Sequence, residues 1–277
     1  MAENVLHGPV GVFDSGYGGL TILRELRRVM PEYDYVYLGD NARAPYGTRS
    51  FDVVYRFTLE AVEKLFALGC PLVILACNTA SAKALRTIQQ HDLPSMDPRR
   101  RVLGVIRPTA ERVGELSEGG HVGVLGTPGT VTSRSYDMEI GKLHPAVKVV
   151  SRACPLWVPL VENMEADGPG ADYFVDKYIG ELFAADPLVD TVVLACTHYP
   201  LLLPKIQRAV DGRANVVTQG DIVARSLRDY MSRHPEMDIM CSKGGTCSYM
   251  TTENPDKFTA LASVFMDEPI EVAHVEL

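Results

Sequence analysis

Two apolar segments of the sequence end in a cysteine that is followed by polar side chains. Residues 73–81 read VILACNTAS and residues 192–200 read VVLACTHYP. A lone cysteine in such a run is commonly a small core residue. Here Cys77 and Cys196 each precede hydrogen-bonding side chains and an expected helix start, where free N–H groups and the helix dipole lower the pKa of a thiol. His198 follows Cys196 closely and could promote its thiolate or carry protons. The pattern therefore indicates two candidate reactive thiols.

The elements that must position these thiols follow from the apolar periodicity. Continuous runs rich in Val, Ile and Leu predict strands at Val10–Phe13, Tyr35–Leu38, Leu72–Ala76, Val102–Ile106, Val122–Leu125, Val147–Val150, Thr191–Ala195 and Asn215–Val217. Helical spacing predicts helices at Leu20–Val29, Phe51–Leu68, Ala80–Gln90, Thr109–Leu116, Asp172–Phe183 and Pro204–Val210. Continuous apolar strands are typical of parallel sheets covered on both faces, so the sequence predicts an α/β fold with mostly parallel sheets.

A weak internal repeat relates the two thiol segments to each other. VGVFDSGYGGLT at residues 10–21 resembles VGVLGTPGTVTS at 122–133, and the cysteine segments recur at a similar offset. The alternative is that Val-Gly-Val and Leu-Ala-Cys are common strings in buried strands. A true repeat predicts two related α/β halves, each with one polar strand end and one cysteine strand end. The chain length of 277 residues suits two domains.

Ligands of open α/β sheets bind beyond the carboxyl ends of the strands. The residues directly after the predicted strands are Asp14, Ser15, Asp40, Asn41, Cys77, Asn78, Thr79, Thr127, Thr130, Cys196, Thr197 and His198. This set is rich in short donors and acceptors, which suits a small polar molecule. The glycine-rich DSGYGG at 14–19 fits no nucleotide-binding spacing. We interpret it as a tight turn that exposes Asp14 and Ser15.

Two kinds of chemistry are compatible with these thiols. A single activated cysteine with a histidine predicts acyl transfer through a covalent intermediate, but that reaction uses only Cys196 and His198 and leaves Cys77 unexplained. Two thiols at matching places in facing halves predict stereoinversion at a carbon atom. One thiolate removes a proton and the other thiol, still protonated, delivers one to the opposite face.

Composition limits the partners and the location of the protein. The formal net charge of −8 disfavours nucleic acid and anionic membranes as partners. No apolar run reaches the roughly 20 residues of a membrane span, and the first residues lack the basic and apolar pattern of a secretory signal. The 6 cysteines are scattered, which favours free thiols in a reducing compartment. We therefore expect a cytoplasmic protein that binds a small molecule.

Six motifs of this chain resemble, in the same order, those of the glutamate racemase family, within the cofactor-independent aspartate/glutamate racemase superfamily. The motifs are DSGYGG, GDNARAPYG, CNTAS, GTPGTVTSRSY, CPLWVPLVE and CTHYPLL. The resemblance implies two α/β domains related by a pseudo-twofold axis, with the active site in the cleft between them. The first domain would comprise residues 1–101 and 214–277, and the second residues 102–213. TQGDIVA at 218–224 differs from the Asp-Ser string usual in the family.

The resemblance also implies a reaction and its residues. The reaction interconverts L- and D-glutamate without a cofactor or a metal, supplies D-glutamate for peptidoglycan, and takes place in a homodimer. Cys77 matches the thiol associated with deprotonating the D-enantiomer, and Cys196 the thiol for the L-enantiomer. Asp14 matches a carboxylate that assists the first thiol, and Glu162 and His198 match groups that assist the second. The positions that match substrate-binding residues are Asp14, Ser15, Pro45, Tyr46, Gly47, Asn78, Thr79, Thr130, Thr197 and His198.

Two rival functions stay open on the same scaffold. Aspartate racemases tend to have Cys-Thr-Glu at the second thiol, whereas this chain has Cys196, Thr197 and His198, which favours glutamate. A binding protein without catalytic activity would be expected to lack one of the thiols. The presence of both favours an isomerase.

Overall fold

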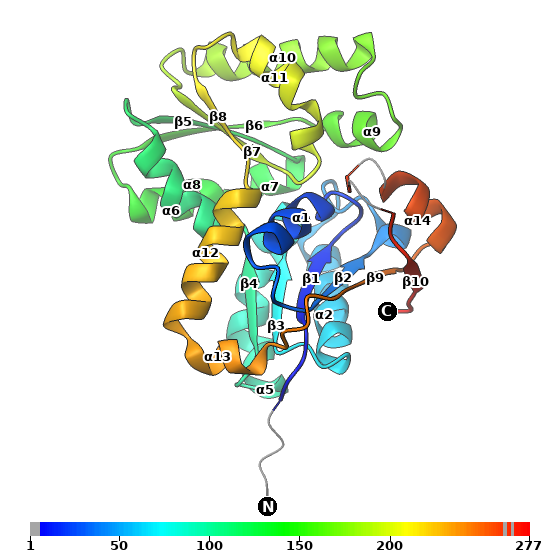
Figure 1. Ribbon diagram of the computed structural model, residues 1–277. Helices are drawn as coiled ribbons and strands as arrows, with labels where there is room; N and C mark the ends of the chain where they lie inside the picture. Colours follow the sequence, from blue (N-terminus) through cyan, green and yellow to red (C-terminus); the bar gives the residue numbers. More distant parts are fainter. Residues whose placement is uncertain (1–5, 263–264, 267–268) are drawn as a thin grey trace, which may run out of the picture.

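Two parallel sheets form the framework of the protein (Figure 1). The computed structural model describes residues 6–262, 265–266 and 269–277. The six-stranded sheet has the order β10-β9-β2-β1-β3-β4, with β1 Val10–Asp14, β2 Tyr35–Gly39, β3 Leu72–Leu75, β4 Arg101–Gly104, β9 Cys247–Thr251 and β10 Val272–His274. The four-stranded sheet has the order β6-β5-β7-β8, with β5 His121–Gly126, β6 Lys148–Ala153, β7 Thr191–Ala195 and β8 Asn215–Val217. The predicted α/β fold with parallel sheets is confirmed.

Helices connect and cover these strands. We call the six-stranded sheet with its helices the first lobe and the four-stranded sheet with its helices the second lobe. The α-helices of the first lobe and its connections are α1 Leu20–Val29, α2 Phe51–Ala67, α3 Asn78–Lys83, α4 Leu85–Thr87, α5 Leu93–Met96, α12 Gly220–Arg233, α13 Pro235–Met240 and α14 Pro255–Ala262. Those that accompany the second sheet are α6 Ile106–Leu116, α7 Pro128–Ser133, α8 Ser135–Leu143, α9 Trp157–Glu162, α10 Pro169–Ala185 and α11 Leu203–Val210. Short 3₁₀ segments lie at Asn41–Arg43 and Tyr199–Leu202.

The two sheets share one strand order. The order β2-β1-β3-β4 in the first sheet corresponds to β6-β5-β7-β8 in the second. The repeated sequence segments are therefore β1 with β5 and β3 with β7, each in the same place in its sheet. Cys77 and Cys196 follow the corresponding strands β3 and β7, which is the arrangement that a true repeat predicts.

Burial on both faces explains why the strands read as continuous apolar runs. In β7, Val192 and Leu194 belong to the apolar cluster that includes α10 and α11, while Val193 and Ala195 pack with α6 and α8 (Figure 1). Full burial of a side chain such as Val or Leu contributes about 1.5–3 kcal/mol. A strand covered on both faces thus needs an apolar residue at every position.

Some elements differ from the sequence prediction. β9 and β10 were not predicted, because β9 alternates buried and partly exposed residues and β10 is a three-residue strand at the sheet edge. The single helix predicted over residues 80–90 is divided into α3, α4 and a π-helical segment at Ile88–Asp92. Apolar spacing did not reveal these breaks, because Ala84 and Ile88 are both buried and stay four residues apart. The strand predicted at 102–106 ends at Gly104, because its pairing with β3 ends there.

The chain crosses between the lobes at β4–α6 and at β8–α12. β4 pairs with β3 and so belongs to the first sheet, and β8 pairs with β7 in the second. β4 starts at Arg101 and runs across the expected limit at 101, and β8 starts one residue after the expected limit at 214. The division into domains stays a prediction. No helix within the described residues is long and apolar enough to span a bilayer. Residues 1–5, on which part of the secretory-signal expectation depends, lie outside the described residues.

Candidate active site

The two thiols line one cavity between the lobes. Cys77 precedes α3 as its N-cap residue, and Cys196 follows β7 directly. Each is only 6% exposed. The cavity has a volume of about 100 Å³, and its wall includes Ser15, Pro45, Tyr46, Gly47, Cys77, Asn78, Thr79, Glu162, Cys196, Thr197 and His198. The fold therefore brings together most of the residues that the sequence singles out, from strand ends of both sheets.

Cys77 lies in surroundings that keep its thiol protonated. Burial raises the pKa of Cys77, and the nearby carboxylate of Asp14 raises it further. A hydrogen bond with the Ser15 hydroxyl at 3.4 Å and one donated by the Ala80 N–H at 3.5 Å oppose this rise. The resulting pKa of Cys77 is about 12, so the thiol is neutral in the absence of a ligand. A neutral thiol is a proton donor.

Cys196 has the opposite kind of neighbour. Its sulfur lies 3.9 Å from Nδ1 of His198, whose Nε2 lies 2.9 Å from Oε1 of Glu162. Burial alone would lower the pKa of His198, but the interactions with Cys196 and Glu162 outweigh it and raise that pKa to about 10. A protonated His198 stabilises negative charge on the Cys196 sulfur. This thiol is therefore placed to act as a base.

Asp14 is buried, contrary to the expected turn that exposes it. Its side chain is fully inaccessible, and burial raises the pKa of its carboxyl. The turn folds back over the carboxylate, which accepts the Gly16 N–H at 2.9 Å and the Thr197 hydroxyl at 3.4 Å. Ser15 alone of the pair reaches the cavity. Asp14 thus acts on the cavity through Thr197 and through its charge near Cys77.

Glycines let the two lobes approach each other at the site. A Cβ on Gly18 would lie 2.3 Å from Oγ1 of Thr197 and 2.5 Å from Nδ1 of His198. A Cβ on Gly47 would lie 2.9 Å from Cβ of Thr127. Such contacts are too short for any side chain to occupy. The glycine-rich turn therefore serves close packing against the Cys196 segment, which is a use of glycine that needs no phosphate.

Hydrogen bonds between threonine hydroxyls connect the two lobes beside the cavity. Oγ1 of Thr79 lies 2.9 Å from Oγ1 of Thr127 and 3.4 Å from that of Thr130, and the last two are 3.1 Å apart. Thr127 lines the cavity, whereas Thr130 lies behind it, completely buried. Thr127 is among the strand-end residues of the sequence but has no counterpart among the expected binding residues.

The loop that holds Pro45, Tyr46 and Gly47 is held in place by the side chain of Asp40. The Tyr46 hydroxyl donates to the carboxylate of Asp40, which also accepts Nε of Arg43 at 2.7 Å. Asp40, a strand-end residue, therefore supports the loop and does not line the cavity. The sequence reasoning also missed Tyr136 and Gln219, which hydrogen-bond to each other and to Asn78. The only signals for them were the end of GTPGTVTSRSY and the unusual TQGDIVA.

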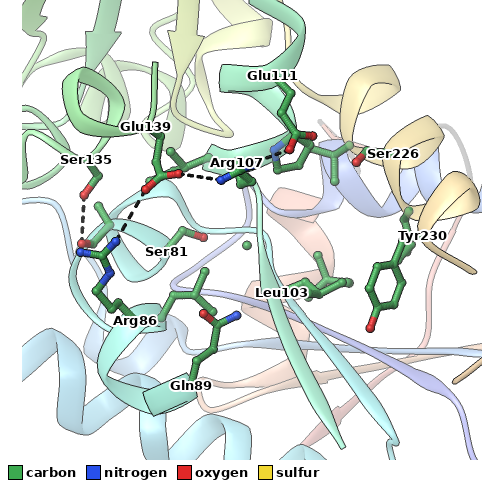
Figure 2. A pocket seen from close by; sticks show the side chains of 18 of the residues that line it. Ser81, Arg86, Gln89, Leu103, Arg107, Glu111, Ser135, Glu139, Ser226 and Tyr230 are labelled. Carbon is green, nitrogen blue, oxygen red and sulfur yellow. Dashed lines mark hydrogen bonds and ion pairs between the residues drawn. The ribbon is translucent and has the colours of Figure 1, made fainter. Parts of the chain in front are cut away.

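A larger cavity is lined by residues of α3, α4, α6, α8 and α12 (Figure 2). It has a volume of about 550 Å³, and no cysteine is among the described residues that line it. Across it, Glu139 of α8 pairs with Arg86 at 3.8 Å and with Arg107 at 3.4 Å, and Arg107 pairs with Glu111 at 2.7 Å. Size alone does not identify the site of chemistry, because the smaller cavity holds both thiols.

The sequence of this chain matches a known family. Residues 20–227 match the family described as Asp/Glu/Hydantoin racemase. This chain belongs to that family. The matched region contains both thiols, His198 and Glu162, and the family relationship extends beyond it in the comparisons with individual proteins.

Individual members of the family resemble the chain over nearly its whole length. A glutamate racemase of Paracoccus denitrificans is 40% identical over 271 residues, which cover 94% of this chain and 97% of that protein. A crystal structure of a glutamate racemase isoform from Bacillus anthracis has a TM-score of 0.89 at 32% identity and covers 98% of both chains. A Francisella tularensis glutamate racemase in complex with D-glutamate has a TM-score of 0.86 at 29% identity, again over 98% of both chains.

Proposed function

We propose that this protein is a glutamate racemase that interconverts L- and D-glutamate with Cys77 and Cys196 as its two bases. The observation that carries the proposal is that corresponding strands of the two sheets end in thiols that line one cavity. The choice of glutamate as substrate is supported by the names of the relatives, which are about 40% identical over more than 90% of this chain.

The reaction begins with the negative charge on the Cys196 sulfur, stabilised by protonated His198. This thiolate removes the α-proton of L-glutamate, and the neutral Cys77 thiol delivers a proton to the opposite face of the same carbon. One C–H bond breaks and one forms, so the product is D-glutamate, with Cys196 protonated and Cys77 ionised. The reverse direction uses the same groups with their roles exchanged.

The substrate is held by short polar groups. The hydroxyls of Ser15, Thr79 and Thr197 line the cavity and would bind the carboxylate and amino groups. Among the described residues of its wall there is neither lysine nor arginine, so hydroxyl and backbone N–H donors replace a cationic clamp. Further binding roles would fall to Pro45, Tyr46, Gly47, Asn78 and His198, which line the cavity, with Glu162 acting through His198. Asp14 and Thr130 lie outside the wall and would act indirectly, through their hydrogen bonds with Thr197 and Thr79.

The proposed setting follows from the family. D-glutamate would be supplied for peptidoglycan synthesis in the cytoplasm, by a homodimer that uses no cofactor. Residues 1–101 with 214–277 and residues 102–213 would be its two domains, with the limits adjusted so that β4 joins the first and β8 the second.

The test measures the optical activity of L-glutamate with purified protein and no added cofactor. Circular dichroism should decay to zero, and in heavy water the product should carry deuterium at Cα. Loss of an acid or base group lowers the rate about 10²–10⁴-fold. Cys77→Ser and Cys196→Ser should therefore each lower the rate of racemisation by such a factor. A signal that does not decay, that decays only with pyridoxal phosphate, or that decays at the full rate in either variant would contradict the proposal.

A further inference from the structure

Gln219 stands where the chain returns from the second lobe to the first. It lies between β8 of the second sheet and α12, and it is the N-cap residue of that helix. α12 then packs along α1 of the first lobe. The Gln219 side chain is buried, so each polar atom of its amide needs a partner within the protein. The partners that it finds come from both lobes.

The amide of Gln219 closes a ring of hydrogen bonds. Nδ2 of Asn78 donates to Oε1 of Gln219 at 2.6 Å, Nε2 of Gln219 donates to the Tyr136 hydroxyl at 2.7 Å, and that hydroxyl donates to Oδ1 of Asn78 at 2.7 Å. Nε2 also donates to Oγ1 of Thr109 at 2.8 Å. All four side chains are buried. Each member of the ring both donates and accepts, which strengthens the bonds in a low-dielectric interior.

The ring reaches the reactive site through Asn78. Asn78 is the first residue of α3 and directly follows Cys77, and both line the thiol cavity. Tyr136 lies on α8 and Thr109 on α6, which both cover the second sheet. The ring therefore ties the segment that carries the first thiol to the lobe that carries the second. The Arg86–Glu139 pair also spans the two lobes, but its arginine is exposed and its distance is 3.8 Å.

We propose that Gln219 is a positioning residue, which through Asn78 and Tyr136 sets the place of the Cys77 segment relative to the Cys196 lobe. The kinetic part of this inference rests on the proposed racemase function. Misplacement of a catalytic group by about 1 Å costs about 10²-fold in rate. No hydrogen bond among the described residues joins Gln219 to either thiol. Gln219 acts only by holding Asn78 in one orientation.

The experiment compares Gln219→Met, Gln219→Glu and Tyr136→Phe in the full-length protein. Gln219→Met keeps the length of the side chain but removes the acceptor of Asn78 Nδ2 and the amide donor to Tyr136 and Thr109. We expect kcat to fall about 10²-fold. Tyr136→Phe opens the same ring, so the double variant with Gln219→Met should be no slower than the slower single variant. Gln219→Glu keeps the acceptor for Asn78 and should recover at least tenfold of the loss. Gln89→Met is the control, because among the described residues its amide donates to the Val102 carbonyl alone, at 2.7 Å. Its kcat should stay within twofold of the wild type.

A second readout is independent of racemisation. Alkylation of each cysteine by iodoacetamide is followed by mass spectrometry, at a temperature where every variant is folded by circular dichroism. Gln219→Met and Tyr136→Phe should change the rate at Cys77 several-fold and leave Cys196 within twofold. Equal change at both thiols, a kcat within threefold of the wild type, or additive losses in the double variant would overturn the inference. Absence of racemisation in the wild type would contradict the proposed function instead, while the alkylation rates still test the positioning.

Discussion

Strands β3 and β7 hold the same place in their sheets, and each is followed by a cysteine that lines the cavity. The neighbours of the two thiols are different. Cys77 lies near the buried carboxylate of Asp14, and together with burial this raises the pKa of the thiol to about 12. Cys196 lies beside His198, whose pKa is raised to about 10 and which is paired with Glu162.

The different neighbours favour different protonation states for the two thiols. The repeated topology brings two thiols to one cavity, whereas inversion requires that one be ionised while the other is protonated. The charges supply that distinction: the carboxylate disfavours a thiolate at Cys77, and the imidazolium favours one at Cys196. In the proposed mechanism, this asymmetry would make Cys196 the side from which substrate is first deprotonated.

Among the variants that test this comparison, the largest effect is expected at the contact between the two halves. Gly18→Ala places a methyl group 2.3 Å from Oγ1 of Thr197 and 2.5 Å from Nδ1 of His198, so the Cys196 segment must move. We expect kcat/KM for glutamate to fall about 10²-fold, since a displacement of about 1 Å has that cost. Stopped-time racemisation assays with both enantiomers measure the change.

Gly141→Ala is the matched control, because a Cβ at Gly141 of α8 meets no described atom within 4 Å apart from its chain neighbours and its own helix backbone. It should leave activity unchanged and stabilise the helix by about 0.5–1 kcal/mol. If Gly18→Ala retained full activity, the close approach of the lobes would have no part in the geometry of the thiols.

A smaller effect is expected when the charge beside Cys196 is removed. His198→Asn keeps a polar side chain but takes away the imidazolium that lies 3.9 Å from the sulfur. The rate of Cys196 alkylation by iodoacetamide at pH 7.5 should fall about tenfold, because the positive charge beside the sulfur is gone. Cys77 should react at its wild-type rate. Equal rates at Cys196 in both proteins would show that the imidazolium does not distinguish the thiols.

The same residue has a consequence for stability. The pKa of His198 is raised from 6.5 to about 10, so its charged form stabilises the folded state. That contribution is fully present below pH 6.5 and is lost as the pH rises through about 10, because the folded state binds the extra proton. The free energy of unfolding, measured in urea, should therefore fall over this range in the wild type and fall less in His198→Asn.

The geometry of the site follows from the sequence better than its electrostatics. Cys77 and Cys196 were predicted together because they end corresponding apolar runs of two related halves, and ligands bind beyond the carboxyl ends of such strands. The burial of Asp14 was not predicted, because it depends on how the turn folds over the carboxylate and packs against Thr197, far away in the sequence. Charge at a thiol depends on such three-dimensional contacts.

The fold also has elements that the local sequence pattern predicts and elements that depend on contacts with distant segments. Interior strands such as β7 were predicted with their bounds, since burial on both faces leaves a continuous apolar run. β10 at the sheet edge leaves no such run. The role of Gln219 was not predicted from the sequence, where it stood out only because TQGDIVA differs from the string usual in the family. A buried amide is recognised by its hydrogen-bond partners, and these come from three other segments of the chain.

The smallest expected effect tests the other half of the comparison. Asp14→Asn keeps the shape of the side chain and its contact with Thr197, and it removes the negative charge that contributes to the raised pKa of Cys77. Burial, the larger cause, is unchanged, so alkylation of Cys77 at pH 9.5 should rise only about threefold, with Cys196 unaffected. An unchanged rate at Cys77 would assign the neutral state of this thiol to burial alone. The two halves would then differ by a charge on the Cys196 side only, and the asymmetry would depend on His198.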